Sequence, residues 1–156
     1  MELTVLPKNN GYTVNDKNSN KNLYTVKKKT FGQKWNLLDT SKYNLYTIAQ
    51  LGDEKKPAFS IILNDVTFLT IECKSQFLDP TLTAKSRTMN YSITSKDRRN
   101  FTIIFNDNII GHINTKVGVT GELQYDIDIE NRFFDDYIPL FAVAVDRTFG
   151  ELNKQQ

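Results

Sequence analysis

The longest uninterrupted apolar run of the chain constrains its fold most strongly. The stretch "DDYIPLFAVAVDRTFG" spans residues 135–150, and every residue from Ile138 to Val145 is apolar. A helix that crosses a membrane needs about 20 apolar residues, so this run is too short for a membrane anchor. A short apolar run fits either a helix that sees no water or a buried strand.

The residues that flank the run favour the helix. Asp135 and Asp136 precede it, and acidic residues stabilise a helix N-terminus. Pro139 falls in the first turn, where its missing N–H costs no hydrogen bond. Gly150 stands where a left-handed C-cap is expected. We therefore predict a buried helix of about thirteen residues, about 20 Å long, with a buried strand as the alternative.

The rest of the chain follows a different period. Apolar and polar residues alternate in stretches such as "FSIIL" and "YDIDI", and clusters of Asn, Asp, Ser and Gly separate these stretches. Alternation indicates strands with one buried face, and turn signals about 8–12 residues apart are typical of an all-β barrel or sandwich. We expect about twelve strands, near residues 2–6, 11–15, 22–28, 34–38, 44–50, 57–63, 66–73, 80–86, 89–95, 100–105, 108–115 and 122–129.

Weak internal repeats suggest how the strands are connected. "NLYTV" at 22–26 returns as "NLYTI" at 44–48, and "FSIILND" at 59–65 returns as "FTIIFND" at 101–107. Such units read as consecutive hairpins in a meander. A barrel of about twelve strands leaves a space that its own side chains cannot fill, and an apolar helix fits that space. We predict one domain over residues 1–156, an all-β barrel of about twelve antiparallel strands that encloses one apolar C-terminal α-helix.

These features resemble a known family. The hairpin pattern "YTVND…NLYTVKKK…WNLLD…NLYTIAQ", the strand "YDIDIEN" and the apolar helix ending in "LFAVAVDRT" look like the tubby C-terminal-like fold over about 11–149. Tubby, phospholipid scramblases and the LURP-one-related proteins of plants and bacteria share that fold. The small bacterial LURP-one-related members look closest.

The resemblance implies a lipid-related role without a catalytic residue set. Tubby binds phosphoinositides, and transfer of lipids between leaflets is proposed for scramblases. Scramblases also carry a Cys-rich region and a membrane-inserted C-terminal helix, whereas this chain has one cysteine. The resemblance therefore does not imply lipid scrambling here.

Composition indicates an ordinary cytoplasmic protein. The formal net charge is +2, which permits weak attraction to anionic surfaces. A single cysteine forms no internal disulfide. The N-terminal residues lack the basic and apolar regions of a signal peptide. We expect a cytoplasmic protein, peripheral to the membrane if it binds lipid.

Sequence motifs of enzymes and cofactor sites are absent. The chain has no P-loop, no H-E-x-x-H, no C-x-x-C and no G-x-S-x-G. His112 reads as a surface residue, and Cys73 as a buried structural thiol. Asp126 and Asp128 share one strand face, where they could hold a cation or do acid–base work, or simply lie on a solvated surface. We expect no enzyme activity, no metal and no cofactor.

Asp146 is the carboxylate that directly follows the apolar run. A carboxylate at the end of a buried helix must lie near an opening or accept hydrogen bonds. We expect it to tie the helix to barrel backbone or to a basic side chain, with a role in a central cavity as the alternative.

Basic residues are expected to gather at one end of the barrel. In a meander, the turns within hairpins lie at one end and the links between hairpins at the other. We assign the basic turn 96–100 to the hairpin-turn end and expect the link end to be more positive. Basic residues beside exposed aromatic side chains suit an anionic membrane surface. The predicted ligand-binding residues at the link end are Lys27, Lys28, Lys29, Phe31, Lys34, Lys85 and Arg87.

The sequence thus favours a non-enzymatic binding module for anionic phospholipid or another anionic or amphiphilic ligand. The alternative is a small protein-interaction or scaffold domain without a ligand of its own. Single-stranded nucleic acid also binds grooves of basic and aromatic residues, but the low net charge and the absence of a stacking motif argue against it.

Overall fold

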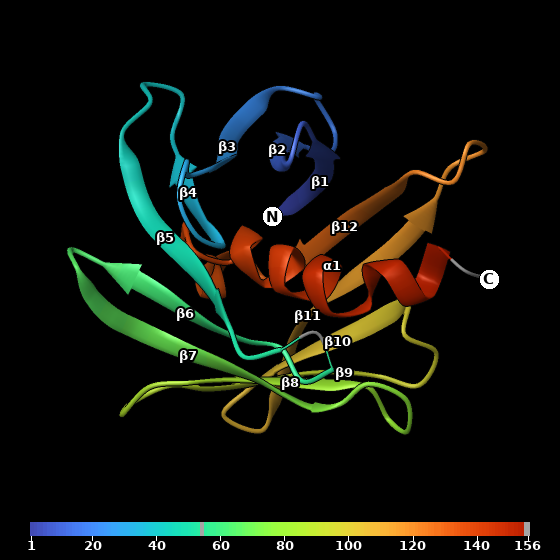
Figure 1. Cartoon of the computed structure of the whole chain (residues 1–156). Helices are drawn as coiled ribbons and strands as arrows, with labels where there is room; N and C mark the ends of the chain where they lie inside the picture. The colour runs from blue at the N-terminus through green and yellow to red at the C-terminus, as the bar shows by residue number, and fades with distance from the viewer. Residues whose placement is uncertain (54, 155–156) are drawn as a thin grey trace.

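Twelve strands form the wall of the molecule in the computed structural model, which describes residues 1–53 and 55–154 (Figure 1). Their positions match the predicted strands to within a few residues. The strands are β1 (Glu2–Lys8), β2 (Gly11–Asp16), β3 (Asn22–Lys28), β4 (Lys34–Leu38), β5 (Asn44–Leu51), β6 (Ala58–Leu63), β7 (Val66–Ser75), β8 (Thr81–Lys85), β9 (Asn90–Ser95), β10 (Asn100–Phe105), β11 (Asn108–Val117) and β12 (Leu123–Ile129).

The strands close into a barrel in sequence order. Each strand pairs antiparallel with the next one, and β12 pairs with β1 through partners such as Leu3 and Ile127. This closure satisfies the backbone hydrogen bonds that an edge strand would leave open. The structure confirms the predicted all-β meander barrel.

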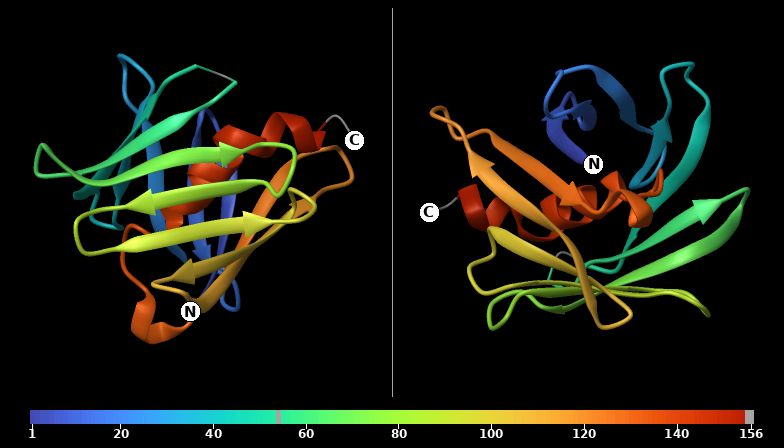
Figure 2. Two further views of the ribbon diagram at one scale, coloured as in Figure 1. Left: turned by 90° about the horizontal axis from the view of Figure 1, so that it is seen from below. Right: turned by 180° about the vertical axis from the view of Figure 1, so that it is seen from behind.

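One helix fills the barrel. The chain leaves β12, forms the short 3₁₀ helix η1 (Asn131–Phe133), and then enters the barrel as α1 (Pro139–Lys154) (Figure 2). Every residue from Ile138 to Val145 is fully buried, because the alternate residues of the strands point inward and surround the helix on all sides. This confirms the predicted buried helix and rules out the alternative of a buried strand.

The predicted C-terminal end of the helix is wrong. Gly150 does not end α1, which continues to Lys154. A Cβ atom at Gly150 would lie 2.7 Å from Oδ1 of Asp146 and 3.3 Å from the hydroxyl of Tyr125. The glycine therefore provides room for a close contact between helix and barrel and does not act as a cap.

The acidic residues before α1 also serve a different purpose from the predicted one. The first turn of α1 contains no acidic residue. Asp136 lies before it and accepts a hydrogen bond of 2.5 Å from the hydroxyl of Tyr24. Burial, followed by this carboxylate, raises the pKa of Tyr24. Asp136 thus fixes the point where the chain enters the barrel.

Within the described residues, no helix is long and apolar enough to cross a membrane.

Candidate functional site

The two ends of the barrel differ in the loops that they carry. Successive connections alternate between the ends, because each strand runs from one end to the other. We call "the basic end" the one formed by loops 9–10, 29–33, 76–80, 96–99 and 118–122 and by residues 52–53 and 55–57, together with the C-terminal half of α1. We call "the acidic end" the one formed by turns 17–21, 39–43, 64–65, 86–89 and 106–107 together with residues 130–138.

Charged side chains separate between these ends. At the acidic end, carboxylates from the turns, from β12 and from the segment before α1 gather, among them Asp39, Asp65, Asp107 and Asp136. At the basic end, cations outnumber carboxylates among the described residues. The cations of the basic end are Lys8, Lys27, Lys28, Lys29, Lys34, Lys55, Lys56, Lys74, Lys96, Arg98, Arg99, Lys116, Arg147 and Lys154.

The structure divides the predicted site residues into two groups. Lys27, Lys28, Lys29, Phe31 and Lys34 lie together at the basic end, in or beside loop 29–33. The connection between β8 and β9, which carries Lys85 and Arg87, lies at the acidic end instead.

The turn 96–99 was also assigned to the wrong end, since it belongs to the basic end. The error has a simple cause. Connections alternate between the two ends of a meander barrel, so a turn lies at one end after an odd number of strands and at the other end after an even number. The residue composition of a turn does not show at which end it lies.

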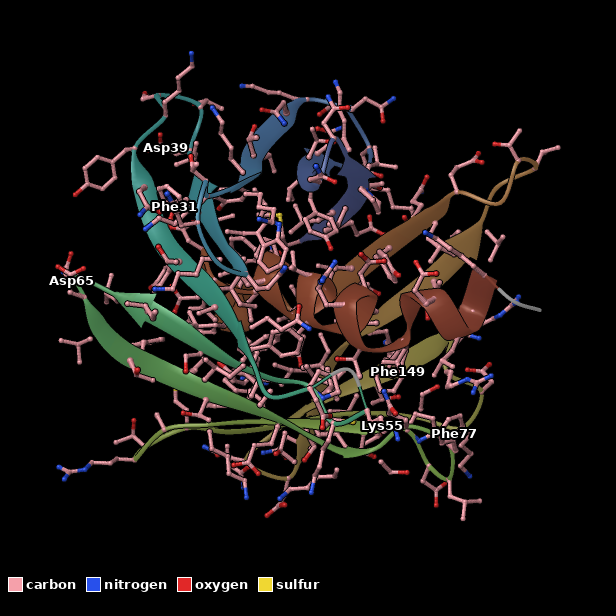
Figure 3. All side chains as sticks on the ribbon, in the orientation of Figure 1. Phe31, Asp39, Lys55, Asp65, Phe77 and Phe149 are labelled. Atoms are coloured by element: carbon pink, nitrogen blue, oxygen red, sulfur yellow. The ribbon has the colours of Figure 1, made fainter. Side chains whose placement is uncertain are left out.

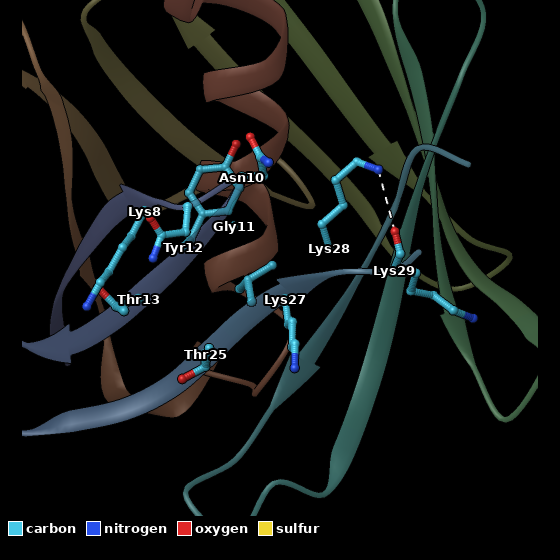
Figure 4. Close-up of a pocket in the computed structure, with 11 residues that line it drawn as sticks. Lys8, Asn10, Gly11, Tyr12, Thr13, Thr25, Lys27, Lys28 and Lys29 are labelled. Carbon is cyan, nitrogen blue, oxygen red and sulfur yellow. Dashed lines mark hydrogen bonds between the residues drawn. The ribbon is translucent and has the colours of Figure 1, made fainter. Parts of the chain in front are cut away.

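A groove on the basic end collects four of the lysines. It has a volume of about 600 Å³ and lies between the connection from β1 to β2 and the end of β3 (Figure 4). Lys28 donates to the carbonyl oxygens of Gly32 at 3.1 Å and of Lys29 at 3.5 Å, which folds loop 29–33 back on itself. The lining residues are Lys8, Asn9, Asn10, Gly11, Tyr12, Thr13, Thr25, Val26, Lys27, Lys28 and Lys29.

The floor of this groove depends on a close backbone approach. A Cβ atom on Gly11 would lie 2.2 Å from the carbonyl oxygen of Val26, so only glycine lets β2 and β3 meet here. Among the described residues, the basic partners of ion pairs are Lys17, Lys74, Arg132 and Lys154, none of which lines the groove. The positive charge of the groove is therefore not neutralised by a neighbouring carboxylate.

A second hollow opens beside α1 at the mouth of the barrel. It has a volume of about 700 Å³ and is lined by Gln50, Lys55, Phe77 and Arg147, among others. The Arg147 guanidinium lies 5.0 Å from the ring centre of Trp35, and its Nε donates to Gln50 at 2.9 Å. Figure 3 labels Lys55 and Phe77 beside this part of the helix. The hollow therefore holds one oriented cation, Arg147, at the same end as the groove, and its lining also includes the carboxylates of Asp146 and Glu151.

Asp146 finds its partners on the barrel wall, at the level of this hollow. Its carboxylate accepts hydrogen bonds from the hydroxyls of Tyr12 in β2 at 2.6 Å and of Tyr125 in β12 at 2.5 Å. Burial, followed by the Asp146 charge, raises the pKa of both tyrosines, so they remain donors at neutral pH. Asp146 does tie the helix to the barrel as predicted, but the partners are tyrosines and not backbone or a basic side chain.

Asp97 organises the loop that presents Arg98 and Arg99. Burial by itself would raise the pKa of Asp97. Hydrogen bonds from the backbone N–H groups of Asn100 and Arg99, and from the side chains of Asn100 and Ser95, outweigh burial and lower the pKa to about 2. The carboxylate therefore stays charged and fixes the turn.

Replacement of Asp97 by alanine should destabilise the protein by about 1 kcal/mol near neutral pH, a modest value because the site is largely exposed. The pKa in the folded protein lies below the ordinary 3.8, so the stabilisation is complete above pH 3.8 and disappears as the pH falls toward 2. Urea unfolding of both proteins between pH 2 and 6 measures this. A difference in stability that stays constant down to pH 2 contradicts the assignment.

The other titratable candidates have structural surroundings. His112 is exposed on the outer face of β11, and Cys73 is buried, which raises its thiol pKa. Asp126 is also on an outer face but is buried, contrary to the expectation of a solvated position. It accepts hydrogen bonds from Thr4 at 3.3 Å and Gln124 at 2.9 Å and lies 3.6 Å from the Lys17 ammonium. The described residues contain no group of three or more His, Cys, Asp or Glu that could hold a metal ion.

A family comparison covers nearly all of this architecture. The family model described as LURP-one-related matches residues 1–146, which include all twelve strands and α1 as far as Asp146. The chain belongs to the LURP-one-related family. Among curated proteins, no match to this LURP-one-related chain is found.

A solved structure shows the same fold. The crystal structure of a protein from Arabidopsis thaliana is similar with a TM-score of 0.63 and 17% sequence identity, over 97% of this chain and 90% of that one. This likeness supports the predicted tubby-like barrel around a single helix.

Sequence reasoning missed several residues of the basic end. Lys8 in β1 and Arg147 in α1 were not included, and Arg98 and Arg99 were placed at the other end. Counting strands from the N-terminus would have assigned Arg98 and Arg99 correctly. The approach of Lys8 to Lys27 depends on the register in which β2 pairs with β3, which the alternation of residues does not specify.

Proposed function

We propose that this LURP-one-related protein is a non-enzymatic module that binds anionic phospholipid at a membrane surface through the basic end of its barrel. The observation that carries the proposal is the separation of charge along the barrel axis. One end presents unneutralised lysines in a groove, and the other end presents carboxylates. Such a molecule is oriented by a negatively charged surface before it makes contact.

Two further observations support lipid binding on the outside of the barrel. The middle of the barrel is occupied by α1, whose buried residues pack against the inward side chains of the strands. The lipid-related role of some proteins that share the fold is consistent with a lipid ligand, although it does not bear on the position of the binding site. The proposal places the protein in the cytoplasm, peripheral to the membrane, with no cofactor.

Charge reversal tests the proposal. Lys27, Lys28 and Lys29 changed together to Glu should weaken binding to vesicles that contain phosphatidylserine by about 100-fold or more, since each lysine near an anionic surface contributes about 1 kcal/mol. The measurement is co-sedimentation with vesicles at low salt, repeated at increasing salt, which should release the wild-type protein.

The acidic end provides a matched control. Changing Lys21, Lys85 and Arg87 to Glu alters the net charge by the same amount, and all three side chains are exposed there. This control variant should bind nearly as well as the wild type. Equal loss in both variants would show that only net charge matters. Absence of wild-type binding at low salt would overturn the proposal and favour the scaffold alternative.

A further inference from the structure

The basic end also exposes apolar side chains at the tips of its loops. Phe31 is 85% exposed, Phe77 is 68% exposed, Leu78 is 85% exposed, and Val119 is fully exposed. They come from three different connections, between β3 and β4, between β7 and β8, and between β11 and β12. None of them contributes to the core, so the fold does not require apolar residues at these positions.

Cations accompany these apolar tips. The Arg98 guanidinium lies 5.8 Å from the ring centre of Phe77, although these residues belong to neighbouring loops. Phe31 stands in the loop that Lys28 closes, between Lys29 and Lys34. Apolar loop tips with basic residues around them match the interface of an anionic bilayer, where the lipid acyl chains are apolar and the headgroups above them are negative.

Carboxylates stand beside exposed apolar residues of the acidic end. Tyr43 follows Asp39 in the same turn, and its backbone N–H donates to the Asp39 carboxylate. Val66 directly follows Asp65, and Figure 3 places Asp39 and Asp65 far from Phe77 and Lys55. An anionic membrane repels these carboxylates, so apolar exposure alone does not make this end a membrane contact.

We propose that the basic end penetrates the membrane interface, with Phe31, Phe77, Leu78 and Val119 inserted at the boundary between headgroups and acyl chains. This inference rests on the proposed function and adds an apolar contribution to it. The C-terminal half of α1 then faces the bilayer, and the acidic end faces away from it. Binding should therefore have a component that salt does not remove.

Paired serine variants separate the two contributions. Phe77→Ser with Leu78→Ser should lower the vesicle partition constant about tenfold or more, because each large apolar side chain gains substantially from burial. The loss should persist at high salt. The matched control is Val66→Ser with Ile109→Ser, which removes exposed apolar residues from the acidic end and should leave binding unchanged.

Depth of insertion is measured directly with a tryptophan probe. The native Trp35 is buried, so it should not report contact with lipid. Phe77→Trp should show a blue-shifted emission and quenching by brominated acyl chains in vesicles that contain phosphatidylserine, whereas Val66→Trp should show neither. Sedimentation of the same samples establishes binding.

The outcomes distinguish the two proposals. Bound protein with an unquenched tryptophan at 77 and no effect of the serine pair overturns the insertion and leaves the electrostatic function intact. Failure of every variant and of the wild type to sediment at low salt overturns the proposed function, and the insertion with it.

Discussion

Replacement of Asp146 by alanine should destabilise the protein by about 3 kcal/mol, because two tyrosine hydroxyls lose a charged acceptor at once. Tyr12 and Tyr125 belong to β2 and β12, on either side of β1, so this one carboxylate joins the helix to both sides of the point where the barrel closes. Urea unfolding measured by circular dichroism gives the free energy.

Asparagine at the same position separates charge from geometry. Asp146→Asn keeps one carbonyl oxygen as an acceptor and adds an amide N–H that can donate to a tyrosine hydroxyl oxygen. It should therefore lower the free energy of unfolding by less than alanine does, by about 1–2 kcal/mol. Tyr12→Phe and Tyr125→Phe complete double-mutant cycles with Asp146→Ala. An alanine variant as stable as the wild type would show that Asp146 does not tie the helix to the barrel.

Removal of the Phe141 side chain should produce the other large loss, about 3–5 kcal/mol, because a buried aromatic ring leaves a cavity. Phe141 is fully buried near the start of α1, and its ring centre lies 5.0 Å from that of Tyr91 and 5.8 Å from that of Tyr137. A domain of this size has a free energy of unfolding of about 5–15 kcal/mol, so Phe141→Ala removes a large part of it.

Phe31→Ala is the control for this prediction. Phe31 is the same residue type, but it is exposed in a loop, and its loss should change stability by less than about 0.5 kcal/mol. Urea midpoints of both variants decide the question. A loss below about 1 kcal/mol for Phe141→Ala would mean that the helix is not the centre of the core.

Local patterns were sufficient to predict the barrel. The strands Asn22–Lys28 and Lys34–Leu38 begin and end where the alternation of residues predicted. The prediction of strands succeeds because every second side chain of a strand points into the barrel and must be apolar, whereas the side chains between them point outward and can be polar. Burial therefore repeats every two residues along each strand. The apolar run 138–145 was equally informative, since a helix surrounded by strands has no polar face.

Features that depend on contacts between distant elements were not predictable in the same way. Gly150 resembles a helix end in the sequence, yet glycine is needed there because Asp146 and Tyr125 leave no room for a side chain. Asp126 looked solvated, yet Thr4 from β1 and Lys17 from the turn before β3 cover it. For Gly150 the missing information is which strand residue faces the helix, and for Asp126 it is which residues of the neighbouring strand and turn lie beside it.

The charge pattern lies between these two cases. Loop 29–33 and its lysines were assigned correctly, because the local run "KKKTFGQK" is distinctive. Arg87 and Arg98 were each predicted at the wrong end of the barrel. The exchange leaves the contrast between the ends unchanged, because Lys96, Arg98 and Arg99 join the basic end with Asp97, whereas Lys85 and Arg87 leave it.

Nuclear magnetic resonance of the labelled wild-type protein with nanodiscs that contain phosphatidylserine shows which end of the barrel contacts the membrane. Backbone amide signals report each loop separately, without any substitution. Membrane contact through the basic end should change the signals of loops 29–33, 76–80 and 96–99 and leave those of turns 39–43, 64–65 and 106–107 nearly unchanged. Changes confined to the acidic end, or spread evenly over both ends, would contradict it.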